Sequence, residues 1–536
     1  MPITEVLSRN ARLFPSETAL IEREPLTGKR REISWLDFDR LANQFAHFLL
    51  ERGLKEGDRA AILMMNCLEW LPVYFGILKT GALAVPINFR FSAPEIKNCL
   101  DTVGARVLVF GPELKDRVEQ IKDLVPSVEC FIYVGEDSPV WSEVFWEVTA
   151  GRPGTKPPVE IDDNQEAALY FSSGTTGCPK PIIITHANLA AAAVTEKKHH
   201  LQSRRDNFLC IPPLYHTGAK MHWFGSLLAG SKAVILRGVK PQWILEAVSE
   251  ELVTIVWLLV PWAQDILDAV ESGELKLTDY RLSQWRLMHI GAQPVPPSLI
   301  WRWKKYFPHQ QYDTNYGLSE ATGPGCVHLG LENIHKVGAI GVPGHRWEVK
   351  IVDENGNPVN NGSVGELIVK GPGVMKGYYN NPEATAQALK DGWLYTGDMA
   401  RMDGDGFIYL VDRKKDIVIC GGENIFPVEV EDHLRAHGDI KDAAVIGLPD
   451  VRLGEIPVAI VELKPGRNTT EEDIIKFCET LPRYKRPRRI FFGEVPRNPT
   501  GKIEKPRLRE KYCGKKEAVL TEGCTPPPRD VCRAAL

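Results

Sequence analysis

The sequence predicts an α/β protein with a large N-terminal region of layered α/β subdomains plus a β-rich subdomain, followed by a small α+β C-terminal domain. Three observations lead to this prediction. The chain of 536 residues is too long for one compact core. Strand-sized and helix-sized apolar segments alternate through much of its first half. A polar connection at residues 412–416 precedes a section of about 100 residues, which is the size of a small separate domain.

The alternation is clearest between residues 58 and 110. Segments of alternating strand and helix length lie, in order, at 60–64, 67–79, 82–87, 93–103 and 106–110. This order predicts βαβ units, and hence a parallel sheet covered by helices. The same rhythm returns with a helix predicted at 243–252 and buried strands predicted at 254–260 and 285–290. We therefore expect a second α/β layer.

The pattern changes to short strands and tight turns between residues 337 and 409. Strand-like runs separated by turns rich in Gly, Asn and Pro lie at 348–352, 365–370 and 406–411. We expect a β-rich subdomain here, before the polar boundary. The predicted division of the chain is an N-terminal domain at 1–412, a connection at 413–415, a C-terminal domain at 416–512 and a flexible tail at 513–536.

The composition excludes several classes of protein. A net charge of -4 gives no general attraction to nucleic acid or anionic lipid. The 11 cysteines lack C-x-x-C pairs and zinc-like spacing, which indicates reduced thiols. The N-terminus has no signal-peptide core, and the longest strongly apolar stretch, 254–262, is far shorter than a membrane helix. We therefore predict a soluble cytoplasmic protein with no membrane span and no nucleic-acid partner, and we leave open whether it forms a homodimer.

The most distinctive local pattern is a loop of small and hydroxyl residues after the strand predicted at 167–171. The loop contains Ser172, Ser173, Gly174, Thr175, Thr176 and Gly177, and Lys180 follows it. Glycines let backbone N–H groups approach an anion, hydroxyls add donors and Lys adds positive charge, so the loop suits a polyphosphate. A Walker A loop does not fit, because the spacing differs and a strand, at 182–184, follows. A plain polar hairpin loop is the alternative.

This segment resembles the phosphate-binding loop of the AMP-forming adenylating superfamily, which includes acyl- and aryl-CoA synthetases, peptide synthetase adenylation domains and firefly luciferase. Pro181 departs from the family loop, which usually has Gly there. The resemblance covers about residues 18–512. It implies an enzyme that uses ATP, Mg²⁺ and CoA, and it implies that Thr175 helps to bind the metal.

Further motifs follow in the family order. One resembles the Y-G-x-T-E motif and consists of Asn315, Tyr316, Gly317, Leu318, Ser319 and Glu320. In the family the Tyr stacks on adenine, the hydroxyl contacts the α-phosphate and the Glu helps to hold Mg²⁺. The resemblance therefore implies catalytic roles for Ser319 and Glu320, with Glu320 as a metal ligand. It also places a nucleotide-bordering loop at Gly291, Ala292 and Gln293.

The remaining nucleotide and thiol positions lie around the predicted domain boundary. Asp398 matches the Asp that accepts hydrogen bonds from both ribose hydroxyls, and Arg413 matches an arginine that contacts the nucleotide. Lys415 falls where the family has its domain hinge, so the resemblance implies that the small C-terminal domain is mobile. The resemblance assigns a segment along the thiol tunnel to Gly421, Gly422 and Glu423.

Near the C-terminus, Lys502 matches the family lysine that touches the acyl carboxylate and the α-phosphate, where positive charge stabilises the transition state. Between Arg483 and Lys516 there are 13 Lys or Arg and 3 Glu. This basic run could be a solvated face or a nucleic-acid patch. We favour a third interpretation, in which Tyr484 and Arg486 contact the CoA nucleotide, as in related aryl-CoA ligases.

A segment that resembles P-L-[FY]-H-x-x-G contains His216, which in the family borders the carboxylate and moves during thioester formation. By family position the acyl pocket draws on Tyr215, Lys220, Trp223, Trp257, Val260 and Leu318. Inward-pointing tryptophans would shorten the cavity, which favours a medium-chain, alicyclic or aromatic acid. For Lys220 we favour a surface position over pairing with a second carboxylate.

The sequence thus predicts an ATP-dependent, AMP-forming ligase that activates a carboxylic acid as an acyl-adenylate and passes the acyl group to CoA. A carrier-protein thiol as acceptor is the alternative within the family. A noncatalytic nucleotide sensor and a basic-tailed nucleic-acid binder are the alternatives from other classes.

Overall fold

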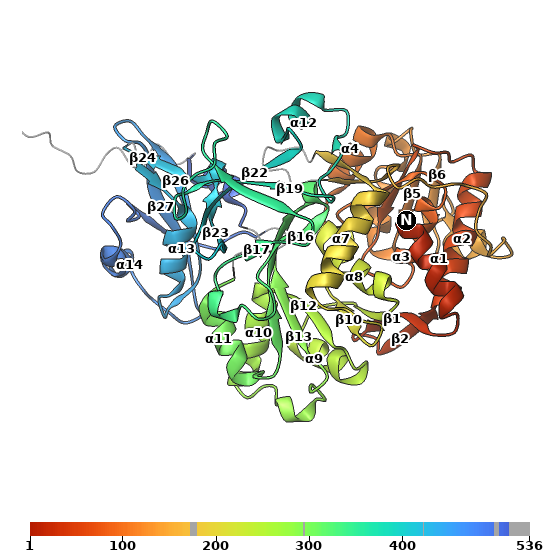
Figure 1. The fold of residues 1–536 in the computed structure, drawn as a ribbon, viewed down its shortest axis with the longest axis horizontal. Coiled ribbons are helices and arrows are strands. Elements are labelled where there is room, and N and C mark those ends of the chain that lie inside the picture. Colours follow the sequence, from red (N-terminus) through yellow and green to blue (C-terminus); the bar gives the residue numbers. More distant parts are fainter. Residues whose placement is uncertain (172–179, 293–294, 422, 498–502, 514–536) are drawn as a thin grey trace, which may run out of the picture. The chain divides into compact units, whose positions relative to one another are not determined.

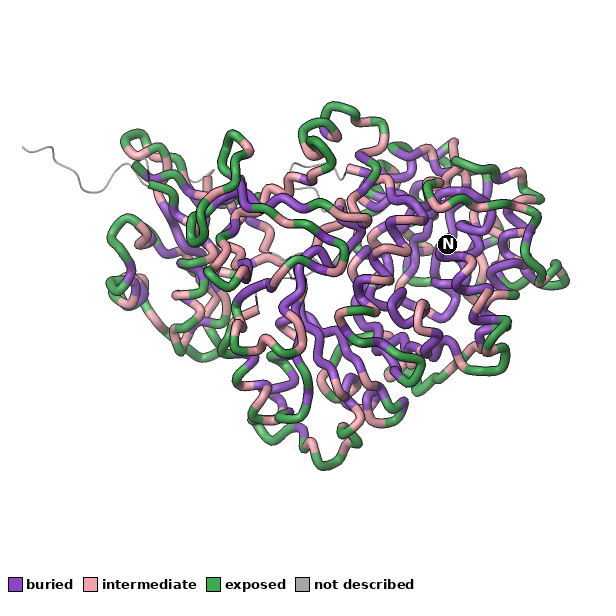
Figure 2. Tube along the Cα trace, in the orientation of Figure 1, coloured by how far each residue is buried: buried purple, intermediate pink, exposed green. Residues whose placement is uncertain are grey.

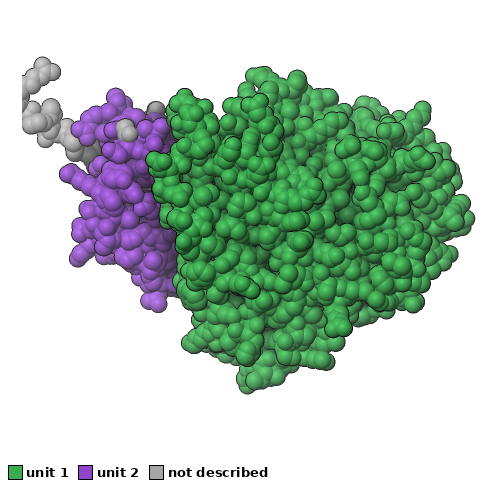
Figure 3. All heavy atoms as spheres, in the orientation of Figure 1, with its two compact units in different colours: residues 1–411, 499–501 green, residues 412–498, 502–536 purple. Residues whose placement is uncertain are grey.

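The computed structural model describes residues 1–171, 180–292, 295–421, 423–497 and 503–513. The chain divides into two compact units, coloured separately in Figure 3. The first contains residues 1–411 and 499–501, and the second contains 412–498 and 502–536. The predicted flexible tail, apart from Cys513, lies outside the described residues.

The first sheet of the N-terminal unit has eight strands and a mainly parallel order. In spatial order they are β20 (Gly377–Tyr378), β9 (Pro181–Thr185), β8 (Glu166–Phe171), β4 (Leu83–Pro86), β3 (Arg59–Leu63), β5 (Val107–Phe110), β6 (Cys130–Tyr133) and β7 (Glu143–Val144). The strands from β8 to β7 are parallel, whereas β9 and β20 are antiparallel to their neighbours. Helices α3 (Trp70–Leu78) and α4 (Ala93–Val103) connect β3, β4 and β5, which confirms the predicted βαβ units.

The start and end of α4 show why the sequence predicted it well. Ser92 and Glu95 form a capping box at its N-terminus, so two otherwise unpaired backbone donors are satisfied. Gly104 ends the helix at φ 59, in the left-handed region that Gly adopts without a steric penalty. The helix therefore has the same bounds as its sequence prediction.

The second sheet has seven strands. In spatial order they are β14 (Gln311–Asp313), β13 (Leu287–Gly291), β12 (Ile255–Leu259), β10 (Asn207–Cys210), β11 (Lys232–Leu236), β1 (Thr18–Glu24) and β2 (Lys29–Ser34). All neighbours are parallel except the hairpin β1–β2. The connections between β11, β12, β13 and β14 run through α9 (Pro241–Glu250), α10 (Val260–Glu271) and α11 (Pro297–Tyr306). The predicted second α/β layer is confirmed.

This unit contains further α-helices besides those in the connections just named. They are α1 (Ile3–Leu13), α2 (Trp35–Glu51), α5 (Lys115–Glu119), α6 (Phe145–Thr149), α7 (His186–His199), α8 (Thr217–Ala229) and α12 (Pro382–Ala388). Helices α7 and α8 lie side by side near the centre of the unit (Figure 1). Aromatic side chains of α2, α3 and α8 pack into one core, and the middle strands of both sheets are buried (Figure 2).

The predicted β-rich subdomain is present. A three-stranded sheet contains β15 (Asn315–Leu318), β16 (Gly323–His328) and β17 (Val342–Pro343). A five-stranded sheet contains β18 (Glu348–Val352), β19 (Gly365–Lys370), β22 (Trp393–Met402), β21 (Leu389–Lys390) and β23 (Ile408–Arg413). Strand β23 carries the chain across the division between the two units.

The C-terminal unit has a five-stranded sheet and its own core. The strands are β25 (Glu423–Ile425), β24 (Val418–Cys420), β27 (Gly454–Leu463), β26 (Ile440–Asp450) and β28 (Ile490–Phe492), and the helices are α13 (Pro427–Arg435), α14 (Glu471–Phe477) and α15 (Lys505–Cys513). Separate apolar clusters lie beneath α13 and α14 on one face and α15 on the other. An α+β domain was predicted here and is observed.

Within the described part of the chain, no helix has the length and apolar character needed to cross a bilayer. The eight cysteines in the same part are all free thiols.

Candidate active site

The predicted phosphate loop joins β8 to β9. The two strands are antiparallel, with Phe171 opposite Pro181, so a strand follows the loop as predicted and a Walker A arrangement is excluded. Ser172, Ser173, Gly174, Thr175, Thr176 and Gly177 lie outside the described residues. Lys180 is described, and its Nζ lies 5.5 Å from the centre of the Tyr378 ring.

Tyr378 also contacts the predicted metal ligand. The hydroxyl of Tyr378 donates a hydrogen bond to Glu320 Oε1 at 3.0 Å. Burial, with the nearby Glu320 carboxylate, raises the pKa of Tyr378, so this hydroxyl stays protonated and remains a donor. Strand β20 sets the position of Tyr378 by pairing with β9, opposite Ile182. One tyrosine thus connects the lysine of the phosphate loop to Glu320, a contact that the sequence analysis missed.

Ser319, whose hydroxyl is predicted to contact the α-phosphate, lies close to the segment that contains His216. Ser319 Oγ, in the 3₁₀ turn η4 (Ser319–Ala321), lies 3.4 Å from Thr217 Oγ1 at the first residue of α8. The ring centres of Tyr215 and His216 lie 4.2 Å apart, and burial raises the pKa of Tyr215 to about 12. Two motifs about 100 residues apart are therefore adjacent in space. Thr217 belongs to the motif that contains His216, but the sequence analysis gave Thr217 no role.

The residues predicted to contact adenine and ribose, Tyr316 and Asp398, are hydrogen-bonded to each other. Tyr316 on β15 donates its hydroxyl hydrogen to Asp398 Oδ2 on β22 at 2.5 Å. Burial, together with Asp398, raises the pKa of Tyr316 well above its usual value. The Asp398 backbone N–H donates to Thr396 Oγ1, and Gly397 has φ 72. This turn fixes the carboxylate beside Tyr316.

A second group of predicted residues surrounds Trp257 on β12. A Cβ atom added to Gly218 would lie 3.2 Å from the indole ring, and one added to Gly291 would lie 3.8 Å from Trp257 Nε1. The same added Cβ atom on Gly291 would lie 3.7 Å from Asn315 Oδ1. Ala292 has φ 70, a strained conformation for a residue with a side chain, and such strain clusters at functional sites. Gln293 lies outside the described residues.

The remaining acyl-pocket residues differ in their surroundings. Val260 begins α10 and is buried, and Leu318 is partly buried beside the first core. Trp223 packs against Phe38 and Phe75 inside the helix layer, with ring centres 6.1 Å apart in both pairs. This position in the core gives no support for Trp223 as a pocket wall.

The surface position favoured for Lys220 is wrong. Its side chain is fully buried, with Nζ 4.4 to 4.7 Å from the ring centres of Trp70, Tyr74 and Tyr170. Nζ also donates to the Leu214 carbonyl oxygen at 3.1 Å. Aromatic faces and a carbonyl can hold an amino group away from water, and burial lowers the pKa of Lys220 well below its usual value.

In the C-terminal unit, the described thiol-tunnel residues lie at a turn. Gly421 has φ 61 and its N–H donates to the Leu453 carbonyl oxygen, whereas Glu423 is exposed in β25. Gly422 lies outside the described residues. Tyr484 is exposed, but Arg486 donates from Nε to the Leu481 carbonyl and from Nη2 to the Glu479 carbonyl. Those donors of Arg486 stabilise the end of a turn.

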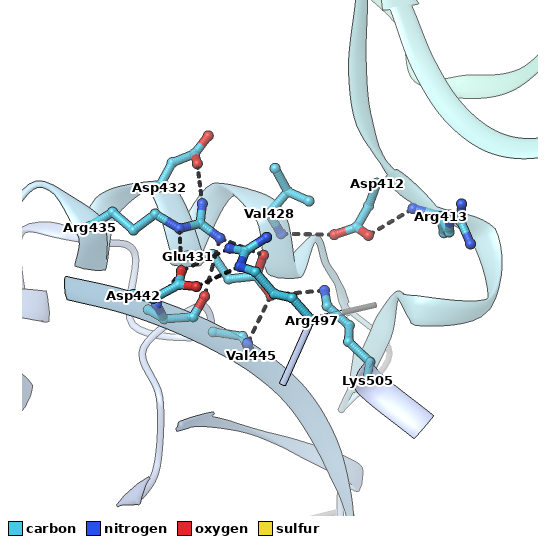
Figure 4. Close-up of polar contacts among 11 residues, drawn as sticks. Asp412, Arg413, Val428, Glu431, Asp432, Arg435, Asp442, Val445, Arg497 and Lys505 are labelled. Carbon is cyan, nitrogen blue, oxygen red and sulfur yellow. Dashed lines mark hydrogen bonds and ion pairs between the residues drawn. The ribbon is translucent and has the colours of Figure 1, made fainter. Parts of the chain in front are cut away.

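The start of the C-terminal unit is held by buried charges (Figure 4). Asp412 accepts the N–H of Arg413 at 2.7 Å and the N–H of Val428 at 2.8 Å, and burial raises its pKa to about 6. Arg497 pairs with Asp442 at 2.7 Å, and Lys505 pairs with Glu431 at 2.9 Å.

In these two ion pairs, and in a third between Arg509 and Asp416, basic residues of the run at 483–516 pair with carboxylates of the same unit. Such pairing weakens the nucleic-acid alternative. Lys502, between Arg497 and Lys505 in the sequence, lies outside the described residues.

The comparisons with known proteins agree with this arrangement. Residues 7–379 match the model of the AMP-binding enzyme family, and residues 429–502 match that of the AMP-binding enzyme C-terminal domain. A long-chain-fatty-acid–CoA ligase of Mycobacterium tuberculosis is 32% identical over 512 residues, which cover 95% of this chain and 98% of the relative. A feruloyl-CoA synthase of Amycolatopsis is 33% identical over 513 residues, covering 94% and 98%.

Solved structures give the same result. An anthranilate CoA ligase in complex with anthranoyl-AMP superposes with a TM-score of 0.86 at 27% identity, covering 95% of this chain and 97% of that one. The o-succinylbenzoate CoA synthetase of Bacillus subtilis, in complex with ATP and magnesium, has a TM-score of 0.82 at 26% identity, covering 95% and 99%. The chain therefore belongs to the AMP-binding enzyme family, as an AMP-forming acid–thiol ligase that uses ATP, Mg²⁺ and CoA.

Proposed function

We propose that this ligase activates a medium-chain, alicyclic or aromatic carboxylic acid as its acyl-adenylate and transfers the acyl group to CoA. The observation that carries the proposal is the meeting of four predicted motifs in the N-terminal unit. Tyr316 bonds to Asp398, Ser319 lies beside Thr217, and Glu320 bonds to the tyrosine that neighbours Lys180. A site for a nucleotide base, a phosphate and an acyl carboxylate needs hydrogen-bond donors and acceptors that lie close together, as these side chains do.

In the first half-reaction, an oxygen of the acid attacks the α-phosphorus of ATP and the bond to pyrophosphate breaks. Asp398 would accept the ribose hydroxyls, and Ser319 would donate to the α-phosphate. Lys502 would stabilise the charge that develops in the transition state. Bound Mg²⁺ would neutralise phosphate charge, and the oxygen donors of Glu320 and Thr175 are of the kind that this ion prefers.

In the second half-reaction, the sulfur of CoA attacks the acyl carbon, the thiol proton is released and AMP leaves. We propose that the C-terminal domain turns about Lys415 between the two steps. Lys502 then serves adenylation, and the segment of Gly421 and Gly422 serves thioester formation. His216, whose ring lies beside that of Tyr215, would border the acyl carboxylate.

The surroundings of Trp257 support the proposed size of the acid. Its indole ring lies between the backbone positions of Gly218 and Gly291, where the absence of side chains leaves it room. A rigid ring at this point would close the acyl pocket early, so long chains would not fit. Relatives are named for acids as different as long-chain fatty acids, ferulate and indoleacetate, so the acid class proposed here depends on Trp257 rather than on kinship.

A CoA-ligation screen over acids of graded length and ring content tests this class, with Trp257→Ala as the paired variant. The wild type should turn over acids of ten carbons or fewer faster than a C16 acid, because Trp257 blocks the longer chain. Trp257→Ala should raise kcat/KM for the C16 acid relative to the short acids by about tenfold or more, the usual scale of discrimination by pocket size. Faster wild-type turnover of the C16 acid would disprove the proposed acid class.

The acceptor is tested by following both products in purified components. Release of pyrophosphate that depends on the acid, followed by loss of CoA thiol without a partner protein, is expected of a CoA ligase. A carrier-protein enzyme would release pyrophosphate but leave CoA intact, and a nucleotide sensor would do neither.

A further inference from the structure

Six ionisable side chains are buried together in the N-terminal unit, where α7 and α8 meet β13, β14 and β16. They are Glu196, His200, His222, His289, Asp313 and His328, and each is 0% exposed. Five separate elements or their ends supply them, and the proposed chemistry uses none of them. Buried charges in proteins are almost always paired or bound to a metal, so a cluster of this size needs an explanation.

Three atoms of the cluster form a triangle of the size found around a metal ion. His200 Nε2 lies 3.0 Å from His289 Nδ1 and 3.2 Å from Asp313 Oδ2, and the third side is 3.7 Å. A point equidistant from all three lies about 1.9 Å from each, so an ion with bonds of about 2.0–2.1 Å fits just out of their plane. His328 Nδ1 lies 3.2 Å from Asp313 Oδ2, and ligand atoms of His200, Asp313 and His328 lie within 4.8 Å of one another.

The outer nitrogens of two of these imidazoles face a second carboxylate. His200 Nδ1 lies 3.4 Å from Glu196 Oε2, and His328 Nε2 lies 3.4 Å from Glu196 Oε1. Metal-binding histidines almost always direct their second N–H at a carboxylate or carbonyl, which fixes the ring orientation. His222 Nδ1 lies 2.6 Å from the same carboxylate.

Charge balance supports a cation. Glu196 and Asp313 are both fully buried, and histidine nitrogens lie within 3.4 Å of each carboxylate. A divalent ion would balance the two buried carboxylates, whereas an uncompensated buried charge is costly.

We propose that this cluster binds one divalent transition-metal ion, with Zn²⁺ as the best fit, through His200 Nε2, His289 Nδ1, Asp313 Oδ2 and His328 Nδ1. Three imidazoles and one carboxylate are ligand types that Zn²⁺ favours, whereas Mg²⁺ prefers oxygen ligands in octahedral geometry. The ion is therefore distinct from the Mg²⁺ that accompanies ATP.

The metal has a structural role at the ends of the strands that lead into the active site. His289 lies on β13, two residues before Gly291. Asp313 is the last residue of β14 and lies two residues before Asn315, the first residue of β15. Asn315 Nδ2 also donates to Glu196 Oε1 at 3.3 Å. The ion would tie these strand ends to α7, so that the backbone on which nucleotide contacts depend is held in place.

Metal content of the full-length chain tests the proposal. The protein is stripped with a chelator, loaded with Zn²⁺ alone and desalted, and the bound zinc is counted by mass spectrometry. Wild type should retain about one ion per chain, whereas Asp313→Asn and His289→Gln should bind at least about tenfold more weakly. His186→Gln is the matched control, because His186 is equally buried on α7 but lies outside the cluster, and it should bind zinc as the wild type does.

Two further measurements decide the result if the cluster variants fold poorly. Co²⁺ loaded into wild type should give the visible d–d absorption of a four-coordinate site without a thiolate charge-transfer band. Chelation should lower the Tm of wild type and of His186→Gln. Retention of less than about a tenth of an ion by wild type, a thiolate or six-coordinate cobalt spectrum, or full zinc binding by the folded Asp313→Asn variant would overturn the proposal.

Discussion

At the scale of single residues, the structure adds partners to roles that the sequence could only assign one at a time. The resemblance indicated separate tasks for Tyr316 and Asp398, whereas the two side chains share a hydrogen bond of 2.5 Å. Tyr316 therefore donates to the same carboxylate that would accept the ribose hydroxyls. Binding of ribose would replace or share this contact, so the two residues should contribute unequally to ATP affinity.

Asp398→Ala should weaken ATP binding by about 2–3 kcal/mol, or about 30- to 150-fold, because two ribose hydroxyls lose a charged acceptor. Tyr316→Phe keeps the aromatic face and removes only the hydroxyl, so its effect should be smaller than about tenfold. Calorimetric titration with ATP measures both. Unchanged affinity in Asp398→Ala would remove this carboxylate from the nucleotide site.

Some residue-scale facts could not be read from the sequence. Lys220 looked like a surface lysine because Lys is seldom buried, and the three rings around it come from α3 and β8, far away in the chain. Tyr378 reaches Glu320 only because β20 pairs with β9. The buried histidine cluster was missed for the same reason, since its members have no local spacing that signals a site.

At the scale of elements, local signals predicted well and long-range pairing did not. The strands at Glu348–Val352 and Gly365–Lys370 have the predicted bounds, because Gly, Asn and Pro mark their ends. The strand order of the sheets was not predictable, because it depends on contacts between distant segments. The parallel pairing of β1 with β11 is an example, since about 200 residues separate the two strands in the sequence.

The start of the C-terminal unit should show a pH-dependent stability. Asp412 has a folded-state pKa of about 6, above its ordinary value of 3.8, so the folded state binds this proton more tightly. Its contribution is therefore fully present below about pH 3.8 and lost as pH rises through about 6, a change of ~3 kcal/mol. Asp412→Asn cannot ionise, so its stability relative to wild type should increase by about this amount from pH 4 to pH 7.

Hydrogen exchange of amides in β26 and β27, measured across this pH range, follows the unfolding of this unit by itself. Glu472→Gln serves as the control, because Glu472 is an exposed carboxylate of the same unit and its replacement should leave the pH profile of wild type unchanged. A difference between Asp412→Asn and wild type that does not vary with pH would contradict the assignment.

At the scale of the whole molecule, the division into two units gives the proposed alternation a physical basis. Lys415 lies in the 3₁₀ turn η6 (Lys414–Asp416), directly after the strand that crosses the division. Lys502 and Gly421 lie about 80 residues apart in the sequence, with strands β25 to β28 between them. One orientation of this domain would then serve each half-reaction.

The two half-reactions should be separable by mutation. Lys502→Ala should slow adenylation by several orders of magnitude, equivalent to about 3–5 kcal/mol, because it removes charge stabilisation from the first transition state. Conversion of supplied acyl-AMP and CoA to thioester should stay near the wild-type rate. Lys415→Pro fixes one backbone dihedral and should keep adenylation but lose thioester formation. Equal loss of both half-reactions in a folded Lys502→Ala variant would favour a single-conformation site.

The parallel pairing of β1 with β11 also constrains how the chain acquires its fold during synthesis. The hairpin β1–β2 leaves the ribosome early, but its partner β11 follows about 200 residues later. At about 5–20 residues per second, the open edge of β1 waits about 10–40 s for its neighbour. Nascent chains in this interval expose a strand that other chains could pair with, so the yield of folded enzyme should depend on chaperone supply and on translation speed between codons 25 and 236.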